Sequence, residues 1–70
     1  MKIIYYIYQE RTKQNMSLRD LAEKSQISKS QINDIENGLK HPSVLTLCQI
    51  ALALQVSPYK LFKMSVITDK

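Results

Sequence analysis

Residues 28–37, SKSQINDIEN, combine hydroxyl, amide, basic and acidic side chains with two isoleucines that stand three positions apart. If Ile32 and Ile35 face a core, the polar side chains are left on the other faces of a short helix. Such side chains can bond to bases: Gln and Asn to adenine, Lys to guanine, Ser to several bases and Asp to the amino group of cytosine. The stretch therefore has the chemistry needed to recognise the edges of nucleic-acid bases.

The residues before this stretch predict an earlier, equally short helix. Ser17 can cap its start, Asp20 stands where a capping-box partner reaches back, and Met16 and Leu21 stand in the positions of a hydrophobic staple. Residues spaced i, i+3, i+4 and i+7 predict its inward face, namely Leu18, Leu21, Ala22 and Ser25.

The same signals recur eleven residues later. Ser28 is the expected cap, Gln31 its capping-box partner, and Ile27 with Ile32 the staple. Gly38 follows the helix and can adopt the left-handed conformation that closes a C-terminus. Because only about three residues separate the two helices, they must cross at a steep angle.

A resemblance to the Xre/Cro-type helix-turn-helix family of phage repressors and small bacterial regulators is carried by LAEKSQISKSQINDIENG, followed by HPS and LCQIALALQVSPYKLF. The resemblance covers about residues 3–62 and implies an all-α fold, a compact five-helix domain like that of lambda repressor. The chain 1–70 would form one domain, with the helix-turn-helix at 18–37 and a tail at 63–70. The matching residues are Leu21, Ala22, Ile27, Ser28, Ile32, Ile35, Glu36, Gly38, Pro42, Ala51, Leu54, Val56, Leu61 and Phe62.

Two positions depart from the family pattern. Gln26 stands in the turn where the family usually has Gly, so a residue with a side chain must adopt a positive φ at a cost of about 1 kcal/mol or somewhat more. Glu10 stands where the family often has Leu. The resemblance also implies that Arg11 and Glu36 form a structural ion pair, which ties the first helix of the domain to the end of the recognition helix.

In the family's mode of binding, the second helix of the motif enters the major groove and the first crosses the phosphate backbone. Carried over by position, this implies base contacts from Lys29, Ser30 and Asp34, with Gln31 and Asn33 as neighbours. Gln31 could instead only complete the capping box, and Asn33 could simply face solvent. Phosphate contacts are expected near the start of the first motif helix and in the connector after the second, from Ser17, Leu18, Arg19, Asn37, Lys40, His41 and Ser43.

Both ends of the chain have competing interpretations. Residues 3–8, IIYYIY, favour a strand by residue type, whereas the helical spacing of their apolar residues and the polar continuation favour a helix over about 3–14. We expect the helix, with a strand that pairs across a dimer as the alternative. Near the other end, Pro58 predicts a short helix over about 58–64. Beyond it, Val66 and Ile67 either pack on a second subunit or fray.

A helix that begins after Ser43 carries two apolar stripes. The predicted core stripe consists of Leu47, Ile50, Ala51 and Leu54. Leu45 and Leu52 fall outside it, at positions where the family commonly has charged residues, and a second apolar stripe on a small helix indicates a partner surface. The expected dimer interface therefore comprises Leu45, Leu52, Val66 and Ile67. Cys48, between the two leucines, is expected to be a small buried side chain.

The composition argues against several classes of protein. A net charge of +4 permits a nucleic-acid or anionic-membrane partner. The stretch 41–59 lacks Lys, Arg, Asp and Glu, but its prolines, glutamines and hydroxyls make it unsuitable as a membrane span. The one Cys indicates a reducing compartment, and hence the cytoplasm. One His, one Cys and one Gly form neither a metal site, nor a nucleophile–base pair, nor a phosphate-binding loop, so we expect no enzyme, metal or cofactor.

These features and the resemblance together imply a transcriptional regulator, by default a repressor, that binds a palindromic operator in double-stranded DNA. A modest charge gives each subunit few contacts with phosphates, so we expect a homodimer. The alternative is a protein-binding module, for example the antitoxin of a toxin–antitoxin pair. In that case the stripe of Leu45 and Leu52, or the tail, would bind a protein partner.

Overall fold

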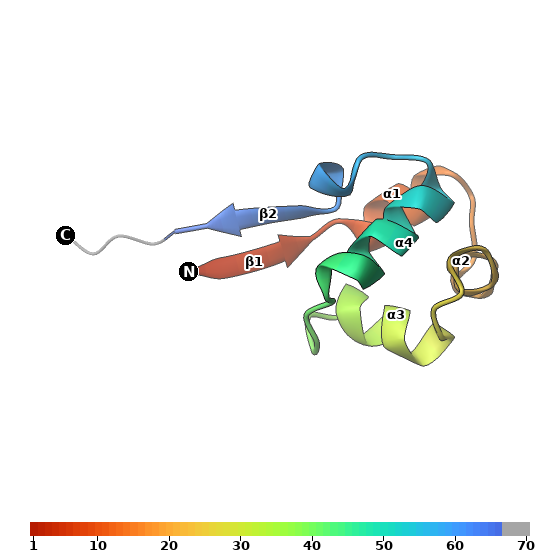
Figure 1. Cartoon of the computed structure of the whole chain (residues 1–70), viewed down its shortest axis with the longest axis horizontal. Coiled ribbons are helices and arrows are strands. Elements are labelled where there is room, and N and C mark those ends of the chain that lie inside the picture. The colour runs from red at the N-terminus through yellow and green to blue at the C-terminus, as the bar shows by residue number, and fades with distance from the viewer. Residues whose placement is uncertain (67–70) are drawn as a thin grey trace.

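The computed structural model describes residues 1–66, in which four α-helices lie between two short strands (Figure 1). The elements follow the order β1 Lys2–Tyr5, α1 Ile7–Lys13, α2 Leu18–Ser25, α3 Lys29–Glu36, α4 Val44–Leu54, the 3-10 turn η1 Pro58–Lys60 and β2 Phe62–Ser65. No helix within residues 1–66 is long and apolar enough to cross a membrane.

Each helix contributes one apolar face to a common core. The predicted stripe of α4 is buried, with Ile50 fully covered and Leu54 only 1% exposed. In α3, Ile32 and Ile35 are buried as their spacing predicts. The largest fully buried side chains are Ile7, Leu21, Ile32, Ile35, Ile50, Leu54 and Leu61.

The strands pair with each other in antiparallel register, Ile3 opposite Met64 and Tyr5 opposite Phe62. The amide of Tyr6 donates to the carbonyl oxygen of Leu61 at 2.8 Å, which continues the pairing to the edge of the helical core. The two-stranded ribbon extends away from the helices and gives the molecule its elongated shape, 45 by 21 by 20 Å (Figure 1).

The ribbon overturns the predicted all-α, five-helix fold. The helix expected over 3–14 is wrong for its first residues, because Lys2–Tyr5 form a strand and α1 begins at Ile7. The strand preference of these residues prevailed because β2 provides hydrogen-bond partners for the backbone N–H and C=O groups of β1. The alternative of a strand was right in kind, but its partner is β2 of the same chain.

The helix expected over 58–64 is also wrong beyond its first turn. Ser57 caps the start and Pro58 occupies the first helical position, as predicted, but the helical turn ends at Lys60. Phe62–Ser65 then form β2, where the tail at 63–70 had no expected element. Long-range pairing with β1 therefore prevailed over the local start signal.

The expectation for Cys48 is wrong as well. Its thiol is exposed, because Cys48 lies on the outer side of α4 rather than in the core stripe. Leu45 and Leu52, the two residues excluded from that stripe, are 71% and 80% exposed. The outer side of α4 is consequently apolar and open to solvent. Ile67 lies outside the described residues, whereas Val66 is described and 60% exposed.

Candidate nucleic-acid interface

The start of α2 is fixed by the predicted capping box. The hydroxyl of Ser17 accepts a hydrogen bond from the amide of Asp20 at 3.0 Å, and the carboxylate of Asp20 accepts one from the amide of Ser17, also at 3.0 Å. The backbone hydrogen bond from Ser17 lowers the pKa of Asp20, and the Ser17 side chain adds to this effect. The acidic group at this helix start therefore stays ionised to lower pH than usual.

The turn between α2 and α3 has the strained geometry that the sequence predicts. Gln26 adopts a left-handed conformation with φ of 64°, where the family usually has Gly. Its amide still donates to the carbonyl oxygen of Ala22, and the amide of Ile27 donates to the hydroxyl of Ser25 at 3.3 Å. Ile27 is buried, so the turn is anchored to the core on its inner side.

Helix α3 is capped by Ser28, whose hydroxyl accepts from the amide of Gln31 at 3.1 Å. The predicted capping box is only half formed, because no hydrogen bond from the Ser28 backbone amide to the Gln31 side chain is present among the described residues. A charged Glu side chain accepts a hydrogen bond from the N-cap amide more strongly than the neutral amide of Gln does. The Gln31 side chain is instead exposed at the surface. At the other end Gly38 closes the helix with φ of 74°, as predicted.

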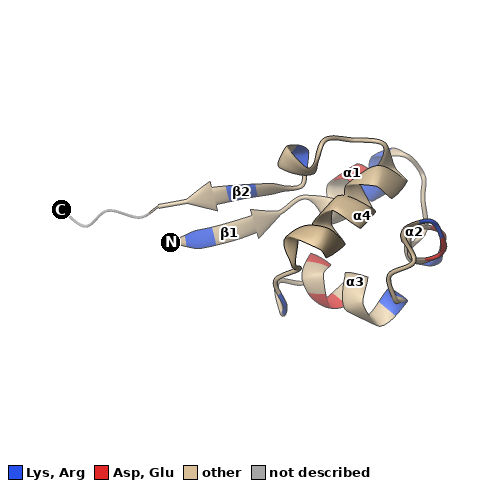
Figure 2. Ribbon diagram, in the orientation of Figure 1, with Lys and Arg blue, Asp and Glu red and all other residues tan. Residues whose placement is uncertain are grey.

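The outer side of α3 is polar and accessible. Lys29, Ser30, Gln31 and Asn33 are all exposed, so α3 presents donors and acceptors along its length. Asp34 is half-buried, and its carboxylate lies 3.6 Å from the Nζ atom of Lys40 in the following connector. Figure 2 shows the basic start and the acidic second half of α3. The structure thus brings the predicted base-contacting residues together on one helix and adds a basic partner for Asp34.

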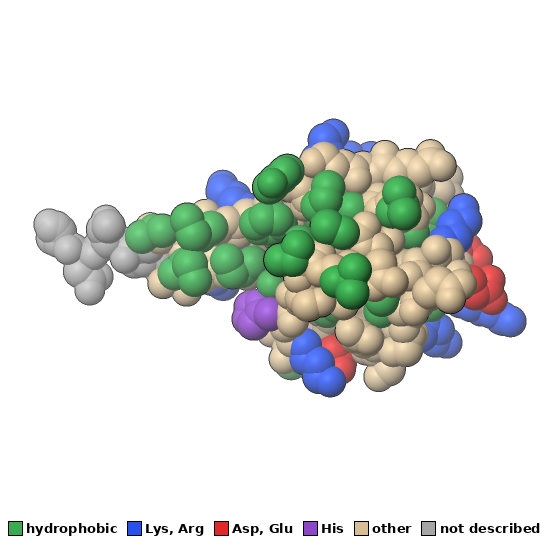
Figure 3. All heavy atoms as spheres, viewed as in Figure 1, with side chains coloured by type: hydrophobic (Ala, Val, Ile, Leu, Met, Phe, Trp, Pro, Cys, Tyr) green, Lys and Arg blue, Asp and Glu red, His purple; other side chains and the backbone are tan. Residues whose placement is uncertain are grey.

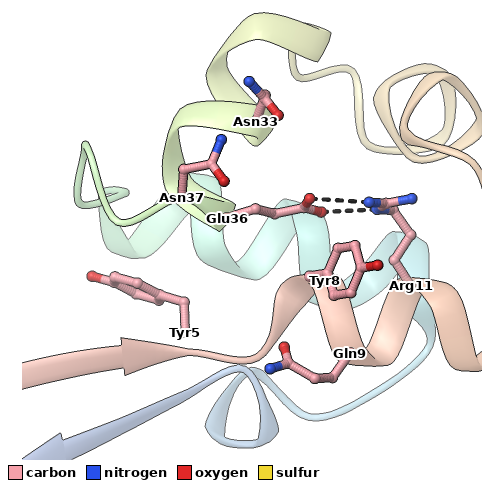
Figure 4. Close-up of a pocket in the computed structure, with 7 residues that line it drawn as sticks. All are labelled: Tyr5, Tyr8, Gln9, Arg11, Asn33, Glu36 and Asn37. Carbon is pink, nitrogen blue, oxygen red and sulfur yellow. Dashed lines mark hydrogen bonds and ion pairs between the residues drawn. The ribbon is translucent and has the colours of Figure 1, made fainter.

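Arg11 and Glu36 form the ion pair that the resemblance implies (Figure 4). The Nε atom of Arg11 donates to Glu36 Oε2 at 2.8 Å, and Nη2 donates to Oε1 at 3.0 Å. A third donor, Nη1, reaches the carbonyl oxygen of Met16 at 3.0 Å. Glu36 raises the pKa of Arg11 by accepting these hydrogen bonds. The pair holds α1 against the end of α3 and so fixes the orientation of the polar helix.

The residues predicted to contact phosphates form two groups in the chain, one at the start of α2 and the other in the connector after α3. At the start of α2, Ser17 is exposed and Arg19 lies 3.5 Å from Glu23 on the same helix. In the connector after α3, the Nδ1 atom of His41 is 2.8 Å from the hydroxyl of Tyr5, and Ser43 caps α4 by accepting from the amide of Thr46. The remaining members of the two groups are Leu18, Asn37 and Lys40.

A polar hollow of about 410 Å³ beside α3 contains residues that the sequence did not single out (Figure 4). Tyr5, Tyr8 and Gln9 line it together with Asn33 and Asn37. A partial signal for Tyr8 existed, because it stands three residues before Arg11 and so lies on the same face of α1. No local pattern indicated Tyr5, whose place depends on the pairing of β1 with β2.

Comparison with known proteins identifies the family. The helix-turn-helix family profile matches residues 7–61. The chain belongs to the Xre-type helix-turn-helix family. Two uncharacterised HTH-type transcriptional regulators of Mycobacterium tuberculosis, from strains CDC 1551 and H37Rv, are each 40% identical over 57 residues, which is 81% of this chain. The chain spans only 41% of the length of these relatives.

A solved structure shares the arrangement of the helices. The restriction-modification controller protein C.AhdI from Aeromonas hydrophila superposes with a TM-score of 0.75 and 26% sequence identity. The match covers 77% of this chain and 82% of the controller protein. The helix-turn-helix part of the fold is thus shared with a protein of known structure.

Proposed function

We propose that this protein is a sequence-specific transcriptional regulator that binds double-stranded DNA through α3 in the major groove. The observation that carries the proposal is the exposed polar side of α3, held rigidly by the cap at Ser28 and by the buried ion pair of Arg11 and Glu36. Lys29 and Ser30 stand in the first turn of α3, the part that meets base edges in helix-turn-helix proteins. Membership of the Xre-type family and the transcriptional-regulator names of its relatives support the same function.

Two groups of residues flank α3 and would contact phosphates on either side of the groove. The hydroxyl of Ser17 and the backbone amide of Leu18 would bind one phosphate at the start of α2, where the helix dipole favours an anion; the backbone amide of Ser17 already donates to Asp20. Lys40, His41 and Ser43 would contact the backbone on the other side, with Asn37 between them and the bases. These contacts position the protein, whereas base contacts provide its sequence preference.

Asp34 has a specific role in this proposal. Its carboxylate can accept a hydrogen bond from the amino group of cytosine. Lys40, 3.6 Å away, would offset its repulsion from the DNA phosphates. We therefore assign Asp34 as a specificity residue and Lys40 as its electrostatic partner.

The regulator would act in the cytoplasm as a homodimer on a palindromic operator, and repression by occupying a promoter is the simplest outcome. One subunit offers few basic residues near α3, so two subunits on adjacent half-sites are needed for a useful affinity. The apolar outer side of α4 would also suit a different protein partner, as in an antitoxin, which makes this the second candidate function.

Selection of bound duplexes from a random DNA pool tests the proposal. We expect a two-fold symmetric motif with half-sites about one helical turn apart, and an affinity that falls steeply with salt. Lys29→Ala should abolish enrichment of the motif. Lys60→Ala is the matched control, since it removes the same charge from η1, away from α3 (Figure 2). Failure of the folded wild-type protein to enrich any motif would refute the proposal.

A further inference from the structure

The ribbon has two chemically different faces. Directly opposed residues of an antiparallel pair lie on the same side, and successive residues alternate. One face therefore carries the pairs Ile3–Met64 and Tyr5–Phe62, and the other carries Lys2–Ser65 and Ile4–Lys63. Tyr5 and Phe62 pack against the core, whereas Met64, further out, is 56% exposed. The side chains of Ile3, Phe62 and Met64 thus form an apolar surface on this face, and this surface extends beyond the core.

This face continues onto the outer side of α4. A hollow of about 220 Å³ joins the two, with Phe62 and Tyr59 on the ribbon side and Val44 and Cys48 on the α4 side. Figure 3 shows apolar side chains over the ribbon and over α4 on the same side of the molecule. The combined surface, called the apolar face below, consists of Ile3, Val44, Leu45, Cys48, Leu52, Tyr59, Phe62 and Met64.

We propose that a second copy of this chain docks on the apolar face, so that the ribbon of each copy covers α4 of the other. The proposal rests on the proposed function, for which it names the interface. Five large side chains of this face are 56–82% exposed, namely Val44, Leu45, Leu52, Tyr59 and Met64. Their exposed surface is on the order of 800 Å², which is what each partner contributes to a standard interface. A two-stranded ribbon is only marginally stable in water by itself, and packing on a second copy would give its apolar face a second layer.

The charge distribution is compatible with a second copy as the occupant. Two identical chains that each carry +4 repel each other, so they associate best through a surface without charges. The apolar face contains no Lys, Arg, Asp or Glu, and the two ribbon lysines, Lys2 and Lys63, lie on the opposite face. An uncharged apolar patch is complementary to itself, as a two-fold symmetric interface requires.

The position of α3 supports the same occupant. In the shared view of Figures 1 and 3 the apolar face points at the viewer, and α3 lies along the lower edge of the helices. Consider a two-fold axis that is vertical in this view and lies in front of the apolar face. Rotation by 180° about this axis generates a partner whose ribbon lies across α4 of the first copy. The rotation does not exchange top and bottom, so both copies of α3 remain at the lower edge. The two recognition helices would then approach one DNA surface in opposite directions, as a palindromic site requires.

Sedimentation equilibrium without DNA tests the interface. Met64→Glu places a charge on the ribbon part of the apolar face, and Leu52→Glu places one on the α4 part. Ser65→Glu is the matched control, since it adds the same charge to the opposite face, where it lies across from Lys2. We expect the wild type and the control to sediment as dimers and both apolar-face variants to show half that mass.

Circular dichroism establishes that each variant is folded, and Leu45→Glu replaces Leu52→Glu if the latter unfolds. A Met64→Glu variant that remains dimeric would overturn the role of the ribbon. A wild-type protein that is monomeric at its highest soluble concentration would overturn the whole interface. That conclusion would hold even if a different protein were found to bind the apolar face. A dimer that enriches no DNA motif would refute the proposed function alone, and a monomer that enriches one would refute the interface alone.

Discussion

Replacing Arg11 with Met should destabilise the protein more than any surface substitution. The change keeps much of the aliphatic length but removes the two hydrogen bonds to Glu36 and the one to the carbonyl oxygen of Met16. The Glu36 side chain is only 6% exposed, so its carboxylate would be left almost buried without a partner. Breaking a buried pair from one side costs about 3–5 kcal/mol.

That cost is large relative to the total. A domain of 70 residues has a free energy of unfolding of roughly 3.5–10.5 kcal/mol, at about 0.05–0.15 kcal/mol per residue. In domains of this size each kcal/mol corresponds to about 4–8 °C in Tm, so the variant should melt at least about 12 °C below the wild type. Urea and thermal unfolding followed by circular dichroism measure both quantities.

Two further variants test the reasoning. Lys13→Met removes the same charge from the surface pair of Lys13 and Glu10, in which Lys13 is 68% exposed, and should cost less than about 1 kcal/mol. The double variant Arg11→Met/Glu36→Leu should recover much of the lost stability, because no buried charge is left unpaired. A loss for Arg11→Met as small as that for Lys13→Met would show that the pair does not hold α1 against α3.

Three other substitutions probe the helix-turn-helix. Because the pKa of Asp20 is lowered in the folded state, its carboxylate stabilises the fold at pH values above the ordinary pKa of 3.8. This contribution disappears as the pH falls through the lower, folded-state pKa. The urea midpoint of Asp20→Asn should therefore lie below that of the wild type at pH 7 and match it in strong acid. Gln26→Gly should raise stability in urea by about 1 kcal/mol, because Gly adopts φ of 64° without strain, and an unchanged or lower midpoint would contradict this. Asp34→Asn should relax the base preference at one position per half-site, measured by repeating the DNA selection, and an unaltered motif would remove Asp34 from the specificity residues.

Local signals in the sequence located the helix-turn-helix correctly. Ser17, Ser28 and Ser43 begin the helices as predicted, and Gly38 ends α3. Capping and apolar spacing act within a few residues, so a sequence pattern contains the information that determines them.

The ribbon and parts of the site depend on contacts between distant residues. Ile3 is paired with Met64, and Tyr5 reaches His41, and neither contact follows from residue spacing. Residues 3–8 satisfied both a helical and a strand pattern, and the strand formed because a partner strand was available at the other end of the chain. The same limit applies to Lys40, whose approach to Asp34 depends on how the connector turns back after α3.

Methylation interference on the selected duplex tests most directly whether α3 reads bases in the major groove. Dimethyl sulfate modifies guanine N7 in the major groove and adenine N3 in the minor groove. If α3 reads bases in the major groove, N7 methylation will block binding at two clusters of guanines about one helical turn apart. Interference confined to adenine N3, or none in either groove, would contradict the placement of α3 in the major groove.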